Sequence, residues 1–159
     1  MTYEQALNKA AAYCSKAERA PRDVASKLRD WDVDEESVDK VLDWLTKENF
    51  LSEERFAHAF VNDKYHFERW GRIKIGYALR QKGIEGSLVQ NTLDDVIDPE
   101  SYLQTAVDLL RTKLRGASGK ALDAKTRAAV YRFAAQRGFE ADICRKALQE
   151  LQIADDSDE

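Results

Sequence analysis

The sequence predicts an all-α protein of three tandem three-helix repeats that form an elongated array. Ala, Leu, Glu, Lys, Arg and Gln dominate the 159 residues, 43% of the residues are hydrophobic, and only two are proline, a composition typical of helical proteins. Few β-branched residues alternate at the period of two that a half-buried strand requires. One pattern of apolar positions also occurs three times, displaced by 51 and then by 55 residues, which indicates a repeat architecture.

The three repeats are centred on apolar residues, namely Val33, Ile84 and Phe139. Relative to each centre, apolar residues stand at −9 and −5, and again at +5, +9 and +12. The first pair shares one face of a helix and the later set shares one face of the next helix, so these positions are the expected core. They are Val24, Leu28, Val38, Leu42 and Leu45; Ile75, Leu79, Val89, Leu93 and Val96; and Val130, Ala134, Cys144, Leu148 and Leu151.

The residue before each centre is expected to end a helix in the left-handed conformation. This position holds Asp32, Gly83 and Gly138. Glycine adopts a positive φ without steric cost, and Asp tolerates it as a substitute. Gly71 is expected just outside the following helix, at the point where the preceding helix must stop.

The first repeat is predicted to cover residues 1–50. Its leading helix occupies residues 2–18, and Pro21 suits the first turn of the second helix because proline lacks an N–H that would need a partner there. The segment 34–45 has helical spacing and is the third helix of this repeat.

The second repeat is predicted to cover residues 51–97. Ser52 is the expected N-cap of a helix over 52–67, although Arg55 replaces the acidic residue of a full capping box. A basic helix follows over 72–82.

The third repeat is predicted to cover residues 98–153. Asp98 and Pro99 form a cap and first-turn pair for its leading helix. Residues 115–125 are expected to be a loop, with the next helix beginning near Asp123 or Ala124.

The net charge of −4 conceals a strong segregation of charge along the chain. Residues 30–54 hold ten acidic residues against two lysines, whereas residues 64–82 hold six basic residues against one glutamate. Residues 111–137 hold eight basic residues against one aspartate. Residues 154–159 are expected to be an acidic disordered tail. The local basic stretches therefore say more about partners than the total charge does.

Motifs that would indicate catalysis or metal binding do not occur in the sequence. His58 and His66 would lie roughly 12 Å apart along one helix, too far to share a metal ion. Cys14 and Cys144 have no nearby second ligand and are expected to be buried or half-buried thiols in a reducing cytosol. No Gly-rich phosphate loop or nucleophile elbow occurs. We therefore expect no catalytic residues, no metal, no cofactor and no enzymatic activity.

A membrane-bound protein is not expected either. No stretch approaches 18 consecutive apolar residues, and the first residues lack a basic segment followed by an apolar run. A cytoplasmic monomer is the expectation.

The basic helix over 72–82 presents an unusual outer face. Ile75 and Leu79 define its buried side, so Ile73 and Tyr77 fall on the opposite side with Lys74 and Arg80 beside them. An aliphatic and an aromatic residue flanked by cations are typical of a surface that binds protein or nucleic acid. Packing of Ile73 and Tyr77 against a neighbouring repeat, and an ordinary charged surface around Lys74 and Arg80, remain open alternatives.

Corresponding positions in the other repeats also carry arginine. They are Arg22, Ser26 and Arg29 in the first repeat, and Ala128, Arg132 and Ala135 in the third. A tandem array with such a face suits an extended target. The candidate partner-binding residues are Arg69, Arg72, Lys74, Tyr77, Arg80, Lys82, Arg22, Arg29, Arg127 and Arg132.

The middle repeat resembles the RecX regulatory proteins, which are bacterial modulators of the RecA recombinase. The matching residues are Phe50, Leu51, Glu53, Phe56, Ala57, Phe60, Gly71, Ile75, Leu79, Lys82, Gly83 and Ile84. The first repeat departs from the family pattern at Ala20, Pro21 and Asp23, and Asn49 stands where the family usually has glycine. The third repeat has the looser Arg-Gly-Phe ending at 137–139.

The resemblance implies an elongated, curved array of the three repeats and a non-enzymatic regulator that binds the RecA–DNA filament. Such a protein inhibits the ATPase, recombination and filament growth of RecA in DNA repair and the SOS response. It would contact single-stranded DNA directly or through the filament. A stand-alone helical DNA-binding protein is the main alternative, although the acidic segments 34–45 and 85–96 suit a DNA groove badly. A helical scaffold that binds no nucleic acid is a further alternative.

Overall fold

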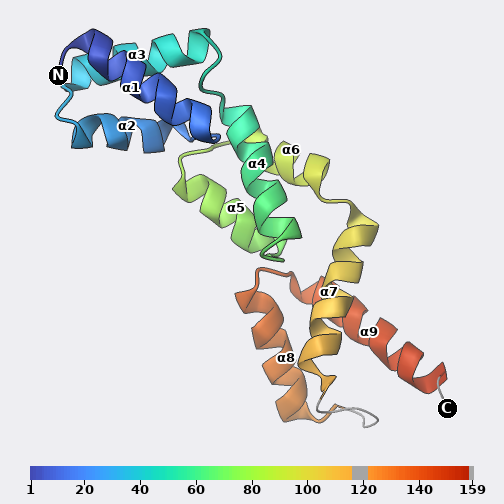
Figure 1. Cartoon of the computed structure of the whole chain (residues 1–159). Helices are drawn as coiled ribbons and strands as arrows, with labels where there is room; N and C mark the ends of the chain where they lie inside the picture. The colour runs from blue at the N-terminus through green and yellow to red at the C-terminus, as the bar shows by residue number, and fades with distance from the viewer. Residues whose placement is uncertain (116–121, 158–159) are drawn as a thin grey trace. The chain divides into compact units, whose positions relative to one another are not determined.

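The structure, a computed structural model, describes residues 1–115 and 122–157, with side chains described up to Leu151. This described part contains nine α-helices and no strand (Figure 1), which confirms the all-α prediction and the three-helix repeats. The helices are α1 Tyr3–Lys16, α2 Pro21–Asp30, α3 Glu35–Lys47, α4 Glu53–His66, α5 Arg72–Gln81, α6 Ser87–Val96, α7 Pro99–Lys113, α8 Ala124–Gln136 and α9 Ala141–Ser157.

Contacts divide the chain into two compact units. Unit 1 comprises Met1–Val61 and Ala78–Thr92, and unit 2 comprises Asn62–Tyr77 and the chain from Leu93 onward. Helices α1, α2 and α3 pack on one another in unit 1, and α7, α8 and α9 pack on one another in unit 2. The division falls within α4, α5 and α6, so the second predicted repeat contributes to both units. The repeat boundaries at residues 50, 97 and 153 stay a prediction.

Polar caps begin the helices where the sequence predicts them. The Ser52 hydroxyl accepts from the Arg55 N–H at 3.2 Å. The Asp98 and Asp123 carboxylates cap α7 and α8 in the same way. These caps satisfy N–H groups that have no partner within the helix. Because the hydrogen bond from the Thr126 N–H favours the ionised carboxylate, it lowers the pKa of Asp123 below its usual 3.8.

The three predicted left-handed residues are confirmed. Asp32, Gly83 and Gly138 have φ values of 61°, 87° and 96°. Each is followed by an apolar residue whose N–H bonds back to the carbonyl five residues earlier, at 2.9 to 3.1 Å. This is the Schellman arrangement, in which the residue after the left-handed position packs against the helix that it closes. One local motif therefore closes the second helix of every repeat.

Most of the predicted core positions are buried. In unit 1, Val24, Leu28, Val38 and Leu45 are completely buried, together with Ala6 and Ala10 of α1. Val33 and Leu42 are only half-buried, at the edge of this core. The buried third-repeat positions in unit 2 are Val130, Ala134, Phe139, Cys144, Leu148 and Leu151.

The end of α6 corrects the sequence pattern. Val96 is half-buried, whereas Ile97, the next residue, is only 3% exposed. The helix ends at Val96, so the regular spacing no longer sets the direction of the next side chain. Ile97 therefore takes the core position for which the spacing selects Val96.

The two cysteines are buried free thiols, as the sequence predicts. Burial raises the pKa of Cys14 and of Cys144, because the apolar surroundings disfavour the thiolate. Within the described residues, no helix has the length and apolar character needed to cross a membrane.

Two predicted segments lie partly outside the described residues. Residues 116–121 of the predicted 115–125 loop fall there, and α8 begins at Ala124, where the sequence places it. Residues 158–159 of the predicted tail also fall there. Helix α9 continues to Ser157, so it includes residues 154–157, which contain neither the glycine nor the proline that would stop a helix. Disorder of the tail as a whole stays a prediction.

Candidate partner-binding site

Three large apolar side chains are exposed within one short segment of unit 2. Phe67, Ile73 and Tyr77 are 77%, 58% and 64% exposed. Packing of Ile73 and Tyr77 against a neighbouring repeat is therefore wrong for this structure. A cluster of exposed apolar residues in a sequence with 34% charged residues is typical of a surface that meets a partner.

Two lysines lie against the Trp70 ring in the same segment. The Nζ atom of Lys64 is 4.9 Å from the ring centroid and that of Lys74 is 4.2 Å away. The electron-rich face of the indole attracts both ammonium groups and holds them near the exposed apolar residues. Sequence reasoning missed Trp70 and Lys64, because Trp70 lies before α5 and shares no helix with either lysine.

The start of α5 is bonded to other parts of unit 2. The Gly71 N–H donates to the Arg137 carbonyl at 2.7 Å, and the Ile73 N–H donates to the Gly138 carbonyl at 3.0 Å. The Arg72 N–H donates to the Tyr102 hydroxyl at 3.0 Å. The first N–H groups of a helix have no partner within it. Because these bonds supply partners, the beginning of α5 has a defined position on α7 and α8.

The close approach of α5 to the end of α8 needs two glycines. A Cβ atom on Gly71 would lie 2.3 Å from the backbone carbon of Gly138, and one on Gly138 would lie 2.4 Å from the Cβ of Lys74. No side chain larger than hydrogen fits at either position without a shift of the backbone. Gly71 is therefore required by a contact between distant segments, and not only by the end of the preceding helix.

Arg72 supports this junction and is not a free cation. Its Nε lies 3.0 Å from a carboxylate oxygen of Glu140, and its guanidinium carbon lies 4.2 Å above the Tyr102 ring. The Tyr102 hydroxyl also donates to Glu140. Burial, reinforced by this carboxylate, raises the pKa of Tyr102 above its usual value of 10.0. The three side chains form one polar cluster inside unit 2.

Tyr102→Phe is expected to lower the free energy of unfolding by about 1–3 kcal/mol. The substitution leaves the Arg72 N–H and the Glu140 carboxylate without their hydroxyl partner, and a buried polar group without a partner costs about this amount. Urea unfolding followed by circular dichroism measures it. Tyr3→Phe is the matched control, because Tyr3 is 41% exposed. Equal stability of the two variants would contradict a structural role for the cluster.

Three predicted site residues are engaged within unit 1. Lys82 pairs with Asp23 at 3.1 Å, and Arg22 donates to the Gln81 carbonyl at 2.7 Å. Arg29 makes a two-pronged ion pair with Glu35 at 2.6 and 3.0 Å. Its hydrogen bond favours the ionised carboxylate and lowers the pKa of Glu35.

The remaining charged candidates lie on the surface. Arg69, Arg80, Arg127 and Arg132 are exposed, and Lys74 is half-buried. The nine positions of the predicted outer face are all exposed, which confirms that each repeat presents it to solvent. They are Arg22, Ser26, Arg29, Ile73, Tyr77, Arg80, Ala128, Arg132 and Ala135.

Metal-binding geometry was sought across the residues that the structure describes. No group of three or more His, Cys, Asp or Glu side chains there is arranged to hold a metal ion.

Comparison with known proteins identifies the family. Three models of RecX three-helix domains match in order: the first over residues 6–45, the second over 52–93 and the third over 100–148. The chain is 31% identical to a Regulatory protein RecX from Herbaspirillum seropedicae, over 93% of this chain and 92% of that protein. It is 33% identical to one from Clostridium botulinum, over 83% of this chain and 61% of that protein.

Solved structures share the fold. The crystal structure of RecX from Lactobacillus salivarius superimposes with a TM-score of 0.85 at 21% identity, covering 95% of this chain and 97% of that one. The family models match three domains in the expected order, and one relative matches over nearly its full length. The shared fold agrees with both findings. The chain therefore belongs to the RecX family of regulatory proteins.

Proposed function

We propose that this protein is a non-enzymatic, cytoplasmic regulator of RecA that binds the RecA–DNA filament and inhibits its ATPase, recombination and growth. Family membership carries the proposal, since the relatives are named regulatory proteins. The exposed residues Ile73 and Tyr77 support it. They provide an apolar contact surface that the folding of the chain does not use.

Electrostatics supports a filament as the target. A RecA–DNA filament carries phosphates, and cations such as Lys74 and Arg80 would be attracted to them. Attraction between exposed charges weakens as salt screens it, so binding should weaken with rising salt. The acidic residues of α3, in contrast, suit contact with protein rather than with DNA.

Regulation of this kind requires no catalytic group. A protein that binds two adjacent filament subunits in one geometry favours that geometry over others, by as much as its affinity for the two differs. If the favoured geometry hydrolyses ATP slowly, turnover falls although the nucleotide is never touched. Binding at a filament end would block growth by occupying the surface that the next subunit needs.

The direct test is ATP hydrolysis by the cognate RecA on single-stranded DNA, titrated with this protein. The proposal expects inhibition at concentrations well below that of RecA, together with weak binding to bare DNA at the same salt. Unchanged hydrolysis combined with tight, sequence-dependent DNA binding would overturn it. That result would leave a stand-alone helical DNA-binding protein.

Reversal of two charges on α5 tests the candidate surface. The double variant Lys74→Glu/Arg80→Glu is expected to need about tenfold more protein for half-inhibition of RecA, because two cations are replaced by anions at a desolvated contact. The control is Lys125→Glu/Arg145→Glu, which makes the same charge change at exposed positions of α8 and α9. Equal loss in both variants would mean that only net charge matters and that α5 is not the contact.

A further inference from the structure

A polar pocket of about 180 Å³ lies in unit 2, between the end of α4 and the first half of α7. A phosphate group fits in this volume. The residues that line the pocket are Tyr65, His66, Arg69, Ser101, Thr105 and Asp108. Neither the polar cluster at Tyr102 nor the exposed face of α5 makes use of it.

Hydroxyl groups form the α7 wall of the pocket. The Tyr65 hydroxyl lies 2.9 Å from Ser101 Oγ and 3.1 Å from Thr105 Oγ1, and Thr105 Oγ1 donates to the Ser101 carbonyl at 2.9 Å. Because Thr105 gives its one hydroxyl proton to that carbonyl, Tyr65 donates to Thr105 and accepts from Ser101. The three hydroxyl protons are therefore used within the wall, and the donors for a ligand come from Arg69 and His66.

Arg69 occupies a strained turn at the opposite wall. Its φ of 56° is unusual for a residue with a side chain. Such a conformation costs about 1–3 kcal/mol and persists only where surrounding contacts enforce it. Arg69 is exposed, so its own burial does not explain the strain.

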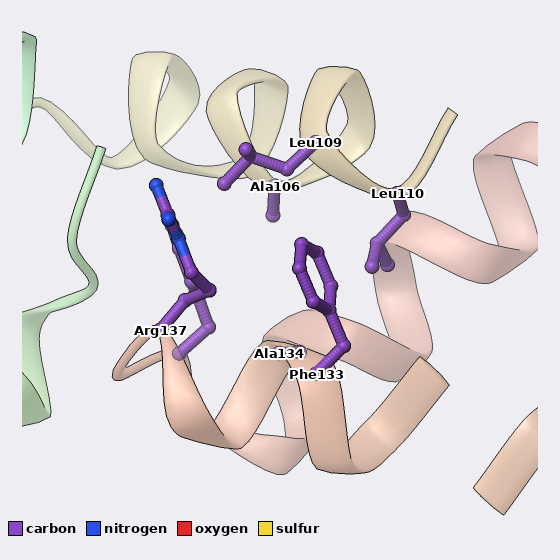
Figure 2. A pocket seen from close by; sticks show the side chains of 7 residues that line it. Ala106, Leu109, Leu110, Phe133, Ala134 and Arg137 are labelled. Atoms are coloured by element: carbon purple, nitrogen blue, oxygen red, sulfur yellow. The ribbon is translucent and has the colours of Figure 1, made fainter. Parts of the chain in front are cut away.

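Arg137 supplies the enforcing contacts. Its guanidinium donates to the Glu68 carbonyl at 2.5 Å and to the Arg69 carbonyl at 3.4 Å. Figure 2 shows Arg137 at one end of a small apolar pocket between α7 and α8, where Phe133 reaches toward Leu110. Arg137 therefore ties the turn to α8 and acts as a positioning residue for Arg69.

The charge balance of the pocket favours an anion. Asp108 is its one carboxylate, and this group accepts from Arg111 at 3.1 Å and from Gln104 at 2.9 Å. Its negative charge is therefore already opposed by a cation outside the pocket lining. Arg69 adds a permanent positive charge, and the His66 ring can donate a hydrogen bond.

An aromatic residue beside the pocket indicates which kind of anion the pocket binds. Phe67 lies between His66 and Arg69 in the chain and is 77% exposed. An exposed aromatic ring beside guanidinium and imidazole donors suits a single strand, because the ring stacks on a base while the donors hold the phosphate. A carboxylate peptide would use the donors but gain less from the ring.

We propose that Arg69 and His66 in this pocket bind a phosphodiester group of single-stranded nucleic acid while Phe67 stacks on an adjacent base. This inference deepens the proposed function, since it assigns a direct DNA contact to the regulator. Its test contains no RecA, so failure of the pocket and failure of RecA regulation are distinguishable.

The experiment measures binding of a fluorescein-labelled oligo-dT strand by anisotropy at low salt. Arg69→Asn is the main variant, because Asn accepts a positive φ more readily than most residues and the substitution removes the positive charge. We expect about tenfold weaker binding and a salt slope smaller by about 0.7, with an unchanged or higher melting temperature. Arg145→Gln, which removes one exposed charge on α9, should change binding less than twofold.

Two further arms separate the phosphate from the base. His66→Ala is expected to weaken binding about threefold, and Phe67→Ala about tenfold. An abasic strand of equal length should lose its sensitivity to Phe67→Ala and keep its sensitivity to Arg69→Asn. Wild-type affinity in Arg69→Asn, or a loss equal to that of Arg145→Gln, would overturn the proposal. Tighter binding of a labelled oligoglutamate peptide than of oligo-dT would overturn it also.

Discussion

Gly138→Ala is expected to lower the free energy of unfolding by about 3 kcal/mol, a larger loss than a positive φ alone would cause. Two costs combine. The φ of 96° at this position is strained for any L side chain, at about 1–2 kcal/mol, and the new Cβ meets the Lys74 Cβ at 2.4 Å and the Lys74 backbone nitrogen at 2.7 Å. Overpacking of a contact that cannot move costs about 1–3 kcal/mol more.

Gly86→Ala is the matched control for this prediction. Gly86 also has a positive φ, of 62°, but nothing lies within 4 Å of the position of its Cβ. Gly86→Ala should therefore lower the free energy of unfolding only through backbone strain, by about 1 kcal/mol. Thermal and urea unfolding of both variants measure the difference. Equal decreases in the free energy of unfolding would show that the backbone at the junction between α5 and α8 shifts at little cost. That result would contradict a rigid support for the α5 surface.

Gly71→Ala separates the clash from the backbone strain. Gly71 has no positive φ, yet its Cβ would meet three backbone atoms of residues 138 and 139 at 2.3 to 2.5 Å. Backbone atoms cannot rotate away as the end of a side chain can. A loss similar to that of Gly138→Ala is therefore expected, together with faster amide exchange at Ile73, whose N–H bonds to the Gly138 carbonyl.

Ile73→Ala/Tyr77→Ala is expected to raise the concentration for half-inhibition of RecA about thirtyfold, the largest functional effect predicted here. Both side chains are more than half exposed, so their removal should leave the melting temperature nearly unchanged. Aromatic residues at the centre of an interface commonly contribute about 2 kcal/mol or more, which corresponds to this factor. The measurement is RecA ATP hydrolysis on single-stranded DNA, titrated with each protein.

Tyr3→Ala is the control for this loss, because Tyr3 is an exposed tyrosine on α1 in unit 1. It should inhibit like the wild type. If the double variant also inhibits like the wild type, α5 is not the contact surface. If instead the double variant unfolds, exposure of the two side chains in solution would differ from the structure, and circular dichroism would report it before any activity is measured.

Much of the fold could be predicted from the sequence, because it depends on interactions between residues that are close in the chain. Helical spacing identified Val24, Leu28 and their equivalents as core, since a side chain's direction on a helix depends only on its position along that helix. Asp32, Gly83 and Gly138 were readable as left-handed turns because only a few residue types tolerate a positive φ.

The candidate site was readable only in part. The helix face of Ile73 and Tyr77, opposite Ile75 and Leu79, followed from the spacing. Their exposure did not follow, because packing of that face against a neighbouring repeat was equally compatible with the sequence. The roles of Arg72 and Lys82 did not follow, because the Glu140 and Asp23 carboxylates that pair with them lie 68 and 59 residues away in the chain. A charge on a helix surface looks alike in sequence whether it is free or paired.

Sequence by itself thus determined the helices, their caps and the outer face, because these depend on neighbours within about two turns. It also determined the repeat, because the same pattern of apolar positions occurs at three places in the chain. Tertiary structure alone decided which cations are free, why Gly71 must lack a side chain, and that Tyr65, Arg69 and Ser101 line one pocket. Those features depend on which distant segments meet. That choice is made by the packing of whole helices, and no local spacing encodes it.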